Sequence, residues 1–291
     1  MTFTTLIGVA SLREVRGESV VLDCRFDLAQ PGAGRQSYLA AHIPGARYAD
    51  LNRDLASPVT ADSGRHPLPS PAAVTQFFVS LGIGDETQVV AYDDANGSLA
   101  ARAWWLLNWL GHPRVAVLDG GFKAWVASGG AVESGEPTTQ VAPGAKRFTA
   151  RLRPETVMTA AEVLRALQDP NRLLVDARAP ERFAGSVEPL DPVAGHVPGA
   201  VNHPFTSNLN SEARFLPAAE LRRLWLARLA GSAPHNMIAM CGSGVTACHN
   251  LLAMSLAGLP GATLYAGSWS EWIRDPDRPV ARGAPAAGEP A

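Results

Sequence analysis

The sequence predicts an α/β protein made of two similar domains, each a mostly parallel sheet with helices on both faces. Its 291 residues are enough for two domains of ordinary size. Short apolar runs rich in β-branched residues alternate along the chain with patterns of helical period. This alternation is typical of a parallel sheet that is covered on both sides. The same order of patterns then occurs a second time.

Four patterns of the first half return in the second half. They are an apolar run ending in Asp-x-Arg, a His-x-Pro-Gly-Ala turn, a buried strand, and a Gly-rich turn before an aromatic helix. The pairs are 21–25 with 174–178, 42–46 with 196–200, 89–93 with 237–241, and 120–125 with 267–272. A repeat this long predicts two similar domains and not a solenoid array.

The expected elements follow the same order in each half. The first half has helical patterns at 71–81 and 99–110 and a strand at 115–118. The second half has helical patterns at 159–167, 217–229 and 245–256, with strands at 237–240 and 263–265.

Two stretches without apolar periodicity suggest the domain limits. Residues 133–156 are rich in Gly, Pro, Thr and Ser and are expected to be a linker. Residues 282–291 are expected to be a disordered tail. We therefore expect an N-terminal domain over 1–132 and a C-terminal domain over 157–281.

Bulk composition argues against several classes of protein. The 25 basic and 27 acidic residues nearly balance, and no basic block suggests nucleic acid or a membrane surface as partner. Three cysteines without paired spacing argue against a disulfide framework or a zinc site and fit a reducing compartment. The N-terminus does not resemble a signal peptide, and no run approaches the length of a membrane span. We expect a soluble, cytoplasmic protein.

The strongest candidate site is the stretch that begins at Cys241. An apolar run ends at this cysteine, two glycines follow at Gly242 and Gly244, and a helical pattern begins at Val245. Glycines allow successive backbone N–H groups to turn inward, and the start of a helix adds partial positive charge. Such a loop holds an anion through the main chain, which would favour the thiolate form of Cys241.

Three chemistries use a strand, a cysteine, a loop and a helix in this order. A cysteine-dependent phosphatase needs an arginine six residues after the cysteine, where this chain has Ala247. A thioredoxin-like redox site needs a second cysteine at position 244, which is glycine. Sulfur transfer needs only the cysteine and the amide nest, without a metal or another cofactor. A purely structural buried cysteine is the remaining alternative.

The string Cys-Gly-Ser-Gly-Val-Thr-Ala at 241–247 resembles the active-site loop of the rhodanese-like sulfurtransferases, especially their 3-mercaptopyruvate branch. The thiosulfate branch usually carries charged residues where this chain has Gly242 and Ser243. The resemblance covers nearly the whole chain and implies two rhodanese-like domains. It also implies transfer of sulfur from 3-mercaptopyruvate or thiosulfate to a thiol or cyanide, with a thioredoxin-like reductant as a candidate partner.

The resemblance also assigns roles to individual residues. It implies that Ser243 takes part in proton handling, that Arg182 binds the anionic group of the donor, and that Asp50 and His66 approach the catalytic loop. The hydroxyl of Thr246 is expected to cap the following helix. The remaining loop positions expected to hold the substrate are Gly242, Gly244, Val245 and Thr246.

Two features of the sequence leave the function open. The 3-mercaptopyruvate branch usually has a second arginine before its His-x-Pro-Gly turn, but segment 187–195 has none, so thiosulfate stays a candidate donor. The alternative function is a persulfide carrier or binding module that delivers sulfur to a protein partner. A neutral Gly-Ser-Gly loop favours a small keto-acid donor, whereas an exposed basic rim would favour protein docking.

The residue matching Cys241 in the first half is Asp93 or Asp94, and an aspartate cannot accept a sulfane sulfur. The first domain is therefore expected to be a non-catalytic copy. We expect structural roles for several other conspicuous residues. These are Arg178 paired with Asp176, His42 and His196 in turns, Trp269 in the core, and Cys24 and Cys248 as small apolar fillers.

Overall fold

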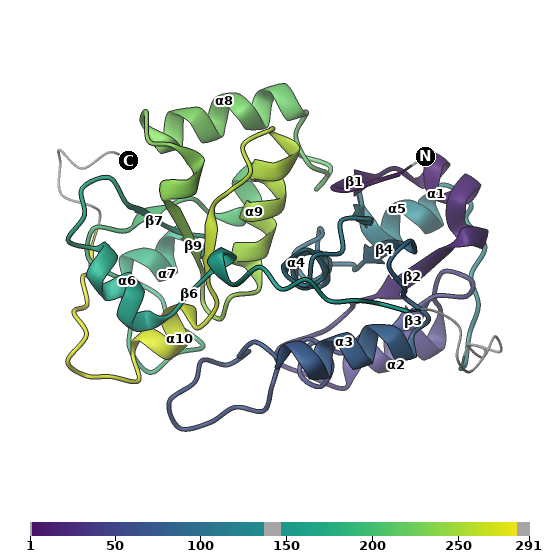
Figure 1. Ribbon diagram of the computed structural model, residues 1–291, viewed down its shortest axis with the longest axis horizontal. Helices are drawn as coiled ribbons and strands as arrows, with labels where there is room; N and C mark the ends of the chain where they lie inside the picture. The colour runs from purple at the N-terminus through teal and green to yellow at the C-terminus, as the bar shows by residue number, and fades with distance from the viewer. Residues whose placement is uncertain (1, 137–146, 284–291) are drawn as a thin grey trace. The chain divides into compact units, whose positions relative to one another are not determined.

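The computed structural model describes residues 2–136 and 147–283 (Figure 1). The chain forms two compact units. The first comprises Met1–Ser57, Leu68–Arg153 and Glu212–Arg214, and the second comprises Pro58–Pro67, Pro154–Ser211 and Phe215–Ala291. A short loop of the first half, Pro58–Pro67, therefore belongs to the second unit.

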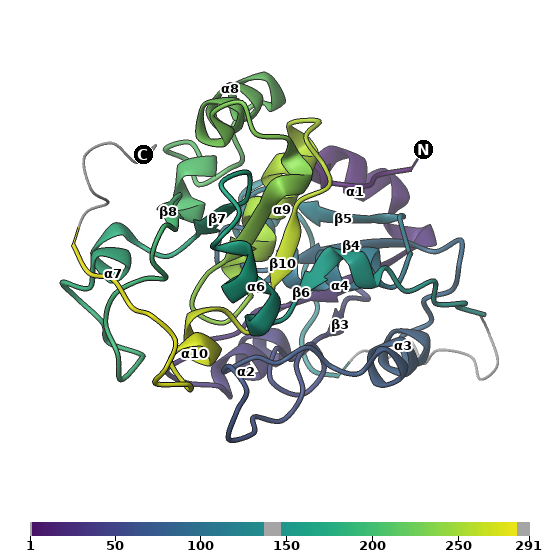
Figure 2. The same ribbon diagram turned by 60° about the vertical axis from the view of Figure 1, so that its left-hand side comes forward.

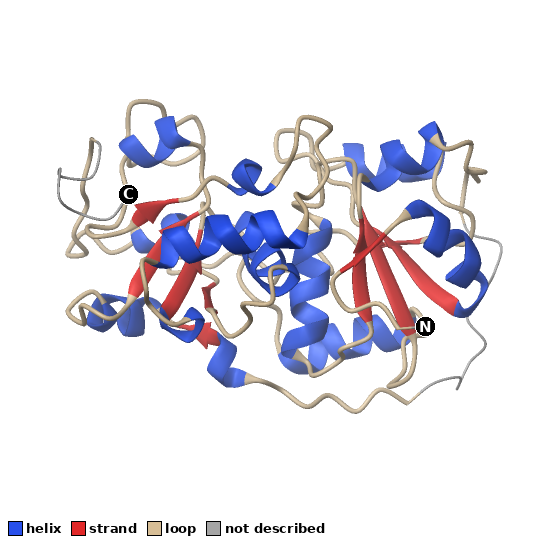
Figure 3. Ribbon diagram, turned by 90° about the horizontal axis from the view of Figure 1, so that it is seen from above, coloured by secondary structure: helices blue, strands red, loops and turns tan. Residues whose placement is uncertain are grey.

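The first unit contains a parallel five-stranded sheet with the order β1-β5-β4-β2-β3. Figure 3 shows its strands fanning out near the N-terminus, with helices on both sides. The strands are β1 (Leu6–Ile7), β2 (Ser19–Asp23), β3 (Arg47–Tyr48), β4 (Gln88–Tyr92) and β5 (Val115–Leu118). The helices are α1 (Val9–Val15), α2 (Ala33–Ala40), α3 (Pro71–Ser80), α4 (Ala100–Trp109) and α5 (Gly121–Ala127).

The second unit has a parallel sheet with the order β6-β10-β9-β7-β8, which is the same topology. Helix α9 packs against β9, and α8 packs against α9 (Figure 1 and Figure 2). The strands are β6 (Val157–Met158), β7 (Leu173–Asp176), β8 (Val201–Asn202), β9 (Met237–Met240) and β10 (Thr263–Tyr265). The helices are α6 (Ala160–Ala166), α7 (Pro180–Ala184), α8 (Ala218–Leu229), α9 (Thr246–Leu256) and α10 (Ser268–Trp272).

The predicted fold class is confirmed, because each unit is a parallel sheet flanked by helices and the two strand orders match. The helical patterns at 71–81, 99–110, 159–167, 217–229 and 245–256 all correspond to helices. The sequence did not predict β1, β6, α1, α2 or α7. Helices α1 and α7 have seven and five residues, which is too short for an apolar period to stand out.

The repeated Asp-x-Arg motif joins the end of a strand to the turn that precedes the next one. In the second unit Arg178 forms a buried ion pair with Asp176 (2.7 Å) and donates to the Gly195 carbonyl. In the first unit Arg25 pairs with Asp23 (2.6 Å) and donates to the Ala41 carbonyl. The structural role expected for Arg178 is therefore confirmed.

The two repeated histidines have equivalent structural contacts. The ring of His42 stacks on the ring of Tyr38 with the centroids 4.2 Å apart. Its Nδ1 lies 2.8 Å from the backbone carbonyl oxygen of Tyr38. His196 makes the same two contacts with Phe183, at 3.9 Å and 2.8 Å. Both histidines thus anchor a turn, as predicted.

Parts of the predicted linker and tail are bonded to their neighbours. Glu133 pairs with His42 through two backbone hydrogen bonds, and Arg151 donates to the Leu110 carbonyl. The N–H of Gly283 donates to the Ala184 carbonyl. Linker residues 137–146 and tail residues 284–291 lie outside the described part of the chain. Among the described residues, no helix is both long and apolar enough to cross a membrane.

Candidate active site

Cys241 directly follows β9, the central strand of the second sheet. It therefore lies at the carboxyl end of a parallel sheet, where ligands commonly bind in α/β folds. Its backbone N–H donates to the Ser268 hydroxyl (3.0 Å), and its carbonyl accepts from the N–H of Trp269 (3.0 Å). The start of α10 thus fixes the main chain of the cysteine on both sides.

The loop after Cys241 is held by the same turn. The Gly242 carbonyl accepts from the N–H of Ser270 (2.9 Å). Gly244 has φ +75°, and a Cβ at this position would collide with the Ala266 carbonyl. Only glycine fits here, because both the conformation and the close approach of backbone exclude a side chain. The glycine that the sequence analysis placed in the amide nest also permits this packing.

Ser268 is a positioning residue whose contact with Cys241 the sequence did not reveal. Its hydroxyl accepts from Cys241 and donates to the Tyr265 carbonyl (2.9 Å). It has φ +53°, a conformation that is uncommon for a residue other than glycine. Such strain persists only where the surrounding structure enforces it. The neighbouring Trp269 is fully buried in the core, as expected.

Ser243 and His66 are brought together within the second unit. The Ser243 hydroxyl lies 2.7 Å from Nδ1 of His66, and both residues are buried, at 7% and 4% exposure. Two backbone contacts hold the loop that carries the histidine. The N–H of Arg65 donates to the Ser270 hydroxyl (3.0 Å), and Gly64 packs directly against the Gly267 carbonyl. A hydroxyl and an imidazole in contact can exchange a proton, and Ser243 is only two positions after Cys241 in the sequence.

Arg182 lies in α7 and is held by two carboxylates of the segment 187–195. It donates to Glu188 through Nε and Nη2 (2.7–3.2 Å) and to Asp191 through Nη2 (3.1 Å). Burial by itself would raise the pKa of Glu188, but the hydrogen bonds from Arg182 and from backbone N–H groups lower it below its ordinary value. The arginine is therefore pre-positioned beside the loop.

Arg65 is a further residue near the loop, and its place there was not predicted from the sequence. Its Nη1 pairs with Asp191, and its Nη2 lies 2.8 Å from the point where a Cβ on Gly242 would be. The nearest nitrogens of Arg182 lie 3.6 and 3.7 Å from the same point. Two guanidinium groups thus flank Gly242. The only signal in the sequence was the position of Arg65 directly before His66.

Asp50 lies in the first unit, where its carboxylate has a local role. One oxygen accepts from the backbone N–H groups of Asn52 (2.9 Å) and Arg53 (3.1 Å), which is the pattern of a turn cap. A catalytic role for Asp50 stays a prediction.

The capping role predicted for Thr246 is wrong. Helix α9 begins at Thr246, and Val245 occupies the N-cap position without a side-chain hydrogen bond. A cap must precede the first helical residue for its oxygen to reach the free N–H groups. The binding roles of Val245 and Thr246 stay predictions.

The equivalent loop of the first unit shows what such a loop binds. The Asp93 carbonyl accepts from the N–H of Phe122 (2.8 Å), as the Cys241 carbonyl accepts from Trp269. Asp93 and not the exposed Asp94 is therefore the counterpart of Cys241. Its buried carboxylate accepts four backbone N–H bonds of 2.8–2.9 Å, from Ala95, Gly97, Leu99 and Ala100. The loop is an anion nest that its own aspartate fills.

The other two cysteines do not begin such a loop, although the thiol of Cys248 in α9 donates to the Gly244 carbonyl (3.3 Å). Cys24 and Cys248 are both buried. Burial and nearby carboxylates raise the pKa of the Cys24 thiol well above its ordinary value. Both residues are fillers, as predicted.

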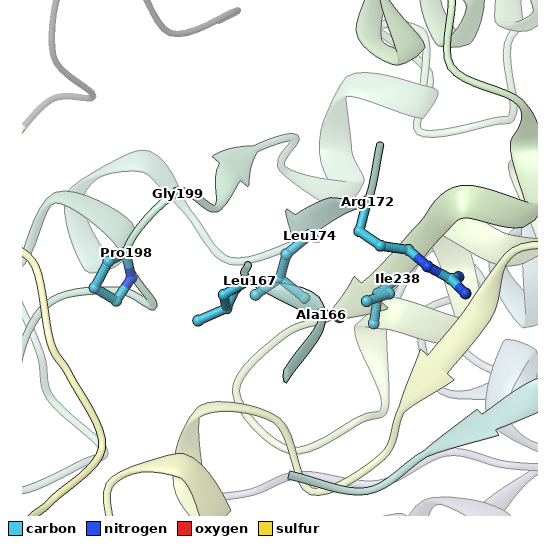
Figure 4. Close-up of a pocket in the computed structure, with 7 residues that line it drawn as sticks. All are labelled: Ala166, Leu167, Arg172, Leu174, Pro198, Gly199 and Ile238. Atoms are coloured by element: carbon cyan, nitrogen blue, oxygen red, sulfur yellow. The ribbon is translucent and has the colours of Figure 1, made fainter. Parts of the chain in front are cut away.

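A small pocket in the second unit lies away from the cysteine (Figure 4). Its lining includes Leu174 and Ile238, the second residues of β7 and β9. The pocket therefore lies at the amino ends of β7 and β9. Cys241 and Arg178 follow the carboxyl ends of these strands, on the opposite edge of the sheet. The lining is mainly apolar, with Arg172 as its one charged residue among those described. It offers no group for chemistry at sulfur.

Comparison with known proteins identifies the family. Residues 10–128 and 159–275 both match the model of the rhodanese-like domain. The chain belongs to the rhodanese-like family. It is 52% identical to a probable 3-mercaptopyruvate sulfurtransferase of Pseudomonas aeruginosa, over 91% of this chain and 92% of that protein. It is 41% identical to a putative thiosulfate sulfurtransferase of Mycobacterium tuberculosis, over 90% of each.

Solved structures agree with this assignment. The 3-mercaptopyruvate sulfurtransferase of Leishmania major superposes with a TM-score of 0.82 at 32% identity, covering 92% of this chain and 74% of that chain. The enzyme SseA of Escherichia coli superposes with a TM-score of 0.75 at 32% identity, covering 92% and 100%. This rhodanese-like protein is a sulfurtransferase.

Proposed function

We propose that this enzyme takes sulfur from 3-mercaptopyruvate, forms a persulfide on Cys241, and passes the sulfur to a thiol or to cyanide. The observation that carries the choice of donor is the 2.7 Å contact between Ser243 and His66, two residues from the cysteine. A hydroxyl and an imidazole in contact can relay a proton. The two candidate donors differ in whether a proton has to move.

Transfer from 3-mercaptopyruvate needs a proton on carbon. The Cys241 thiolate attacks the donor sulfur, and the carbon–sulfur bond breaks with its electron pair moving to the methylene carbon. The resulting enolate takes up the proton that the donor thiol carried. The products are pyruvate and the Cys241 persulfide anion. Ser243 and His66 are placed to carry this proton.

Transfer from thiosulfate needs no proton. The same thiolate attacks the outer sulfur, the sulfur–sulfur bond breaks, and sulfite leaves with the electron pair. A buried Ser243–His66 pair gives this reaction no advantage. The pair therefore favours 3-mercaptopyruvate, and thiosulfate is the second candidate.

The second half-reaction removes the outer sulfur from the enzyme. The persulfide is an anion, and the Asp93 carboxylate in the equivalent loop of the first unit supports the idea that the Cys241 loop stabilises such a group. A thiol or cyanide then attacks the outer sulfur and regenerates the thiolate. A thioredoxin-like reductant is the protein acceptor that we propose for this step. The first unit is proposed to be non-catalytic.

The test compares steady-state rates with 3-mercaptopyruvate and with thiosulfate, using cyanide as acceptor. We expect a kcat/KM for 3-mercaptopyruvate well above that for thiosulfate, and loss of both activities in Cys241→Ser. Cys24→Ser is the matched control and should keep the parent rate. Mass spectrometry of the enzyme mixed with donor alone should show one added sulfur atom on Cys241.

Other outcomes would change the proposal in defined ways. A preference for thiosulfate would make the Ser243–His66 pair irrelevant to the donor step. Persulfide formation on Cys241 without turnover of either donor would favour a sulfur carrier that serves a protein partner. Cys241-dependent release of phosphate from a phosphomonoester would contradict sulfur transfer altogether.

A further inference from the structure

We propose that Arg65 is a second donor-binding residue, which together with Arg182 holds the carboxylate of 3-mercaptopyruvate beside Gly242. This inference rests on the proposed function and extends it. It assigns part of the specificity for an anionic donor to Arg65. The ion-pair partner of Arg65 is Asp191, which lies 126 positions away in the sequence.

The first argument is which guanidinium nitrogens already have partners. Arg65 uses Nη1 for Asp191, and Arg182 uses Nε and Nη2 for Glu188 and Asp191. Within residues 2–136 and 147–283, Nη2 of Arg65 and Nη1 of Arg182 have no hydrogen-bond acceptor. These two nitrogens lie 2.8 and 3.6 Å from the Cβ position of Gly242. One N–H₂ group of each arginine is therefore available beside the catalytic loop.

The second argument is that Arg65 is held in place. Asp191 uses one carboxylate oxygen for Arg65 and the other for Arg182, so a single carboxylate sets the spacing of two like charges. The backbone N–H of Arg65 is fixed on Ser270. In addition, Nε of Arg65 is buried without a partner among the described atoms. A side chain that is positioned before binding loses little conformational entropy when the ligand arrives.

The third argument is the chemistry of the donor. In 3-mercaptopyruvate a single carbonyl carbon separates the carboxylate from the carbon that bears the sulfur. Gly242 directly follows Cys241, so one small molecule can place its sulfur at the cysteine and its carboxylate at Gly242. One N–H₂ group from each guanidinium can donate a charge-assisted hydrogen bond to the carboxylate. The absence of a side chain at Gly242 leaves this space open, since a Cβ there would lie 2.8 Å from Nη2 of Arg65.

The arrangement also accounts for the missing arginine in the segment 187–195. That segment provides no cation of its own, but its Asp191 fixes the guanidinium of Arg65 next to Arg182. The charges of the group are balanced, since Arg65 and Arg182 face Glu188 and Asp191. The donor is therefore recognised by the direction of the N–H groups and not by an excess of positive charge.

The test uses Arg65→Gln with two donors, 3-mercaptopyruvate and its neutral amide. In a ping-pong reaction the kcat/KM for the donor reports only the donor half-reaction. We expect this value to fall about tenfold to a hundredfold for 3-mercaptopyruvate, as for a lost hydrogen bond to a charged group. The value for the amide should change less than about twofold, because it has no carboxylate to lose. Most of the change should be in KM.

Three further variants separate binding from charge and folding. Arg223→Gln removes the same charge from an exposed position on α8 and should leave both donors unaffected. Arg65→Lys keeps the charge without the fork and should give an intermediate loss. Arg65→Gln combined with Asp191→Asn leaves no unpaired carboxylate, although it also removes one bond to Arg182, so recovery of the rate there would trace the loss to Asp191 and not to Arg65. Equal losses for both donors, or no loss for 3-mercaptopyruvate, would overturn the proposal.

Binding of pyruvate tests the proposal independently of turnover. Pyruvate carries the same carboxylate without sulfur, and calorimetry should give a Kd about tenfold weaker for Arg65→Gln than for the parent. If the parent turned over neither sulfur donor, the proposed function would fail. The pyruvate measurement would still show whether Arg65 binds a carboxylate. Equal binding by parent and variant would rule out Arg65 as a carboxylate ligand whatever the activity.

Discussion

The loops after β4 and β9 occupy the same place in their sheets but differ in what they hold. In the first unit the Asp93 carboxylate accepts four backbone N–H bonds from its own loop. In the second unit the same position is Cys241, whose main chain is fixed by Ser268 and Trp269. Both loops are anchored to the helix after the last strand of the sheet. The residue at their start differs, since it is a carboxylic acid in the first unit and a thiol in the second.

This difference separates a loop with a structural role from the loop that we propose to be catalytic. The Asp93 carboxyl group is part of the chain, so no external anion can take its place in the loop. A cysteine supplies an anion only as thiolate or persulfide, and its sulfur can be extended by one atom and restored. The loop of the first unit binds its own carboxylate, and we infer that the equivalent loop of the second unit stabilises the sulfur anion of Cys241.

Replacing Cys241 by alanine should reduce activity, whereas replacing Asp93 by alanine should reduce stability. Cys241→Ala should reduce sulfur transfer at least about a thousandfold, because the nucleophile is gone. Asp93→Ala should leave the rate per folded molecule unchanged. It should lower the free energy of unfolding of the first unit by about 3 kcal/mol or more, because two buried and two partly buried N–H groups lose their acceptor. Activity assays and urea denaturation measure the two effects.

The conservative variant Asp93→Asn serves as the control for this pair. Its amide keeps one acceptor oxygen and should cost less stability than alanine. A loss below about 1 kcal/mol for Asp93→Ala would contradict the interpretation of the loop as a filled nest.

Loss of the Ser243–His66 pair should lower activity less than loss of Cys241 does. Ser243→Ala and His66→Gln should each lower kcat with 3-mercaptopyruvate about a hundredfold, the size expected for general acid–base catalysis. The double variant should be no worse than either single one, because the two residues act as a unit. Rates with thiosulfate should change little. His235→Gln, at an exposed position, is the control, and additive losses would mean that the residues act separately.

The smallest expected difference concerns acid stability. His203 and Ala49 are equivalent, since each donates its N–H to the carbonyl of the aspartate that ends the neighbouring strand (2.9 Å). Burial lowers the pKa of His203 from 6.5 to about 4, although the hydrogen bond to Asn208 opposes this shift. The unfolded chain therefore takes up a proton first as the pH falls. Stability should be lost between about pH 6.5 and pH 4.

Denaturation at pH 7 and pH 5 measures this effect. His203 should account for a loss of about 2 kcal/mol over this interval in the second unit. His203→Phe keeps a ring next to Trp225, which lies 4.2 Å from the histidine ring, and removes the titration. The parent should therefore lose more stability than the variant between the two pH values. An identical pH dependence would show that His203 does not titrate as its burial implies.

Several features of the site could be predicted because they depend on local sequence. The strand, the cysteine, the glycines and the helix of 237–256 are contiguous, so their apolar period and glycine spacing show the loop directly. The repeat predicted two units of one topology because each half contains its full set of strands. Ser243 and Arg182 followed from the resemblance to a family. His66 followed in the same way, although 177 positions separate it from Ser243.

Other features depend on contacts that no local pattern encodes. The choice between Asp93 and Asp94 was ambiguous in the sequence and was decided by the hydrogen bond from Phe122. Ser268 follows a strand in the sequence, but only packing brings its hydroxyl to the N–H of Cys241. The capping role of Thr246 failed because one residue of offset decides whether a side chain can reach the free N–H groups.

The sequence by itself determined the α/β fold, the duplication and the place of Cys241 between a strand and a helix, because periodicity and glycine spacing act over a few neighbouring residues. Tertiary structure alone decided that Arg65 lies beside Gly242, that Asp191 holds it there, and that Asp93 fills its own loop. Guanidinium and carboxylate groups are at the ends of side chains whose partners are set by the folded backbone. Their directions therefore exist only once the sheet and its loops have formed.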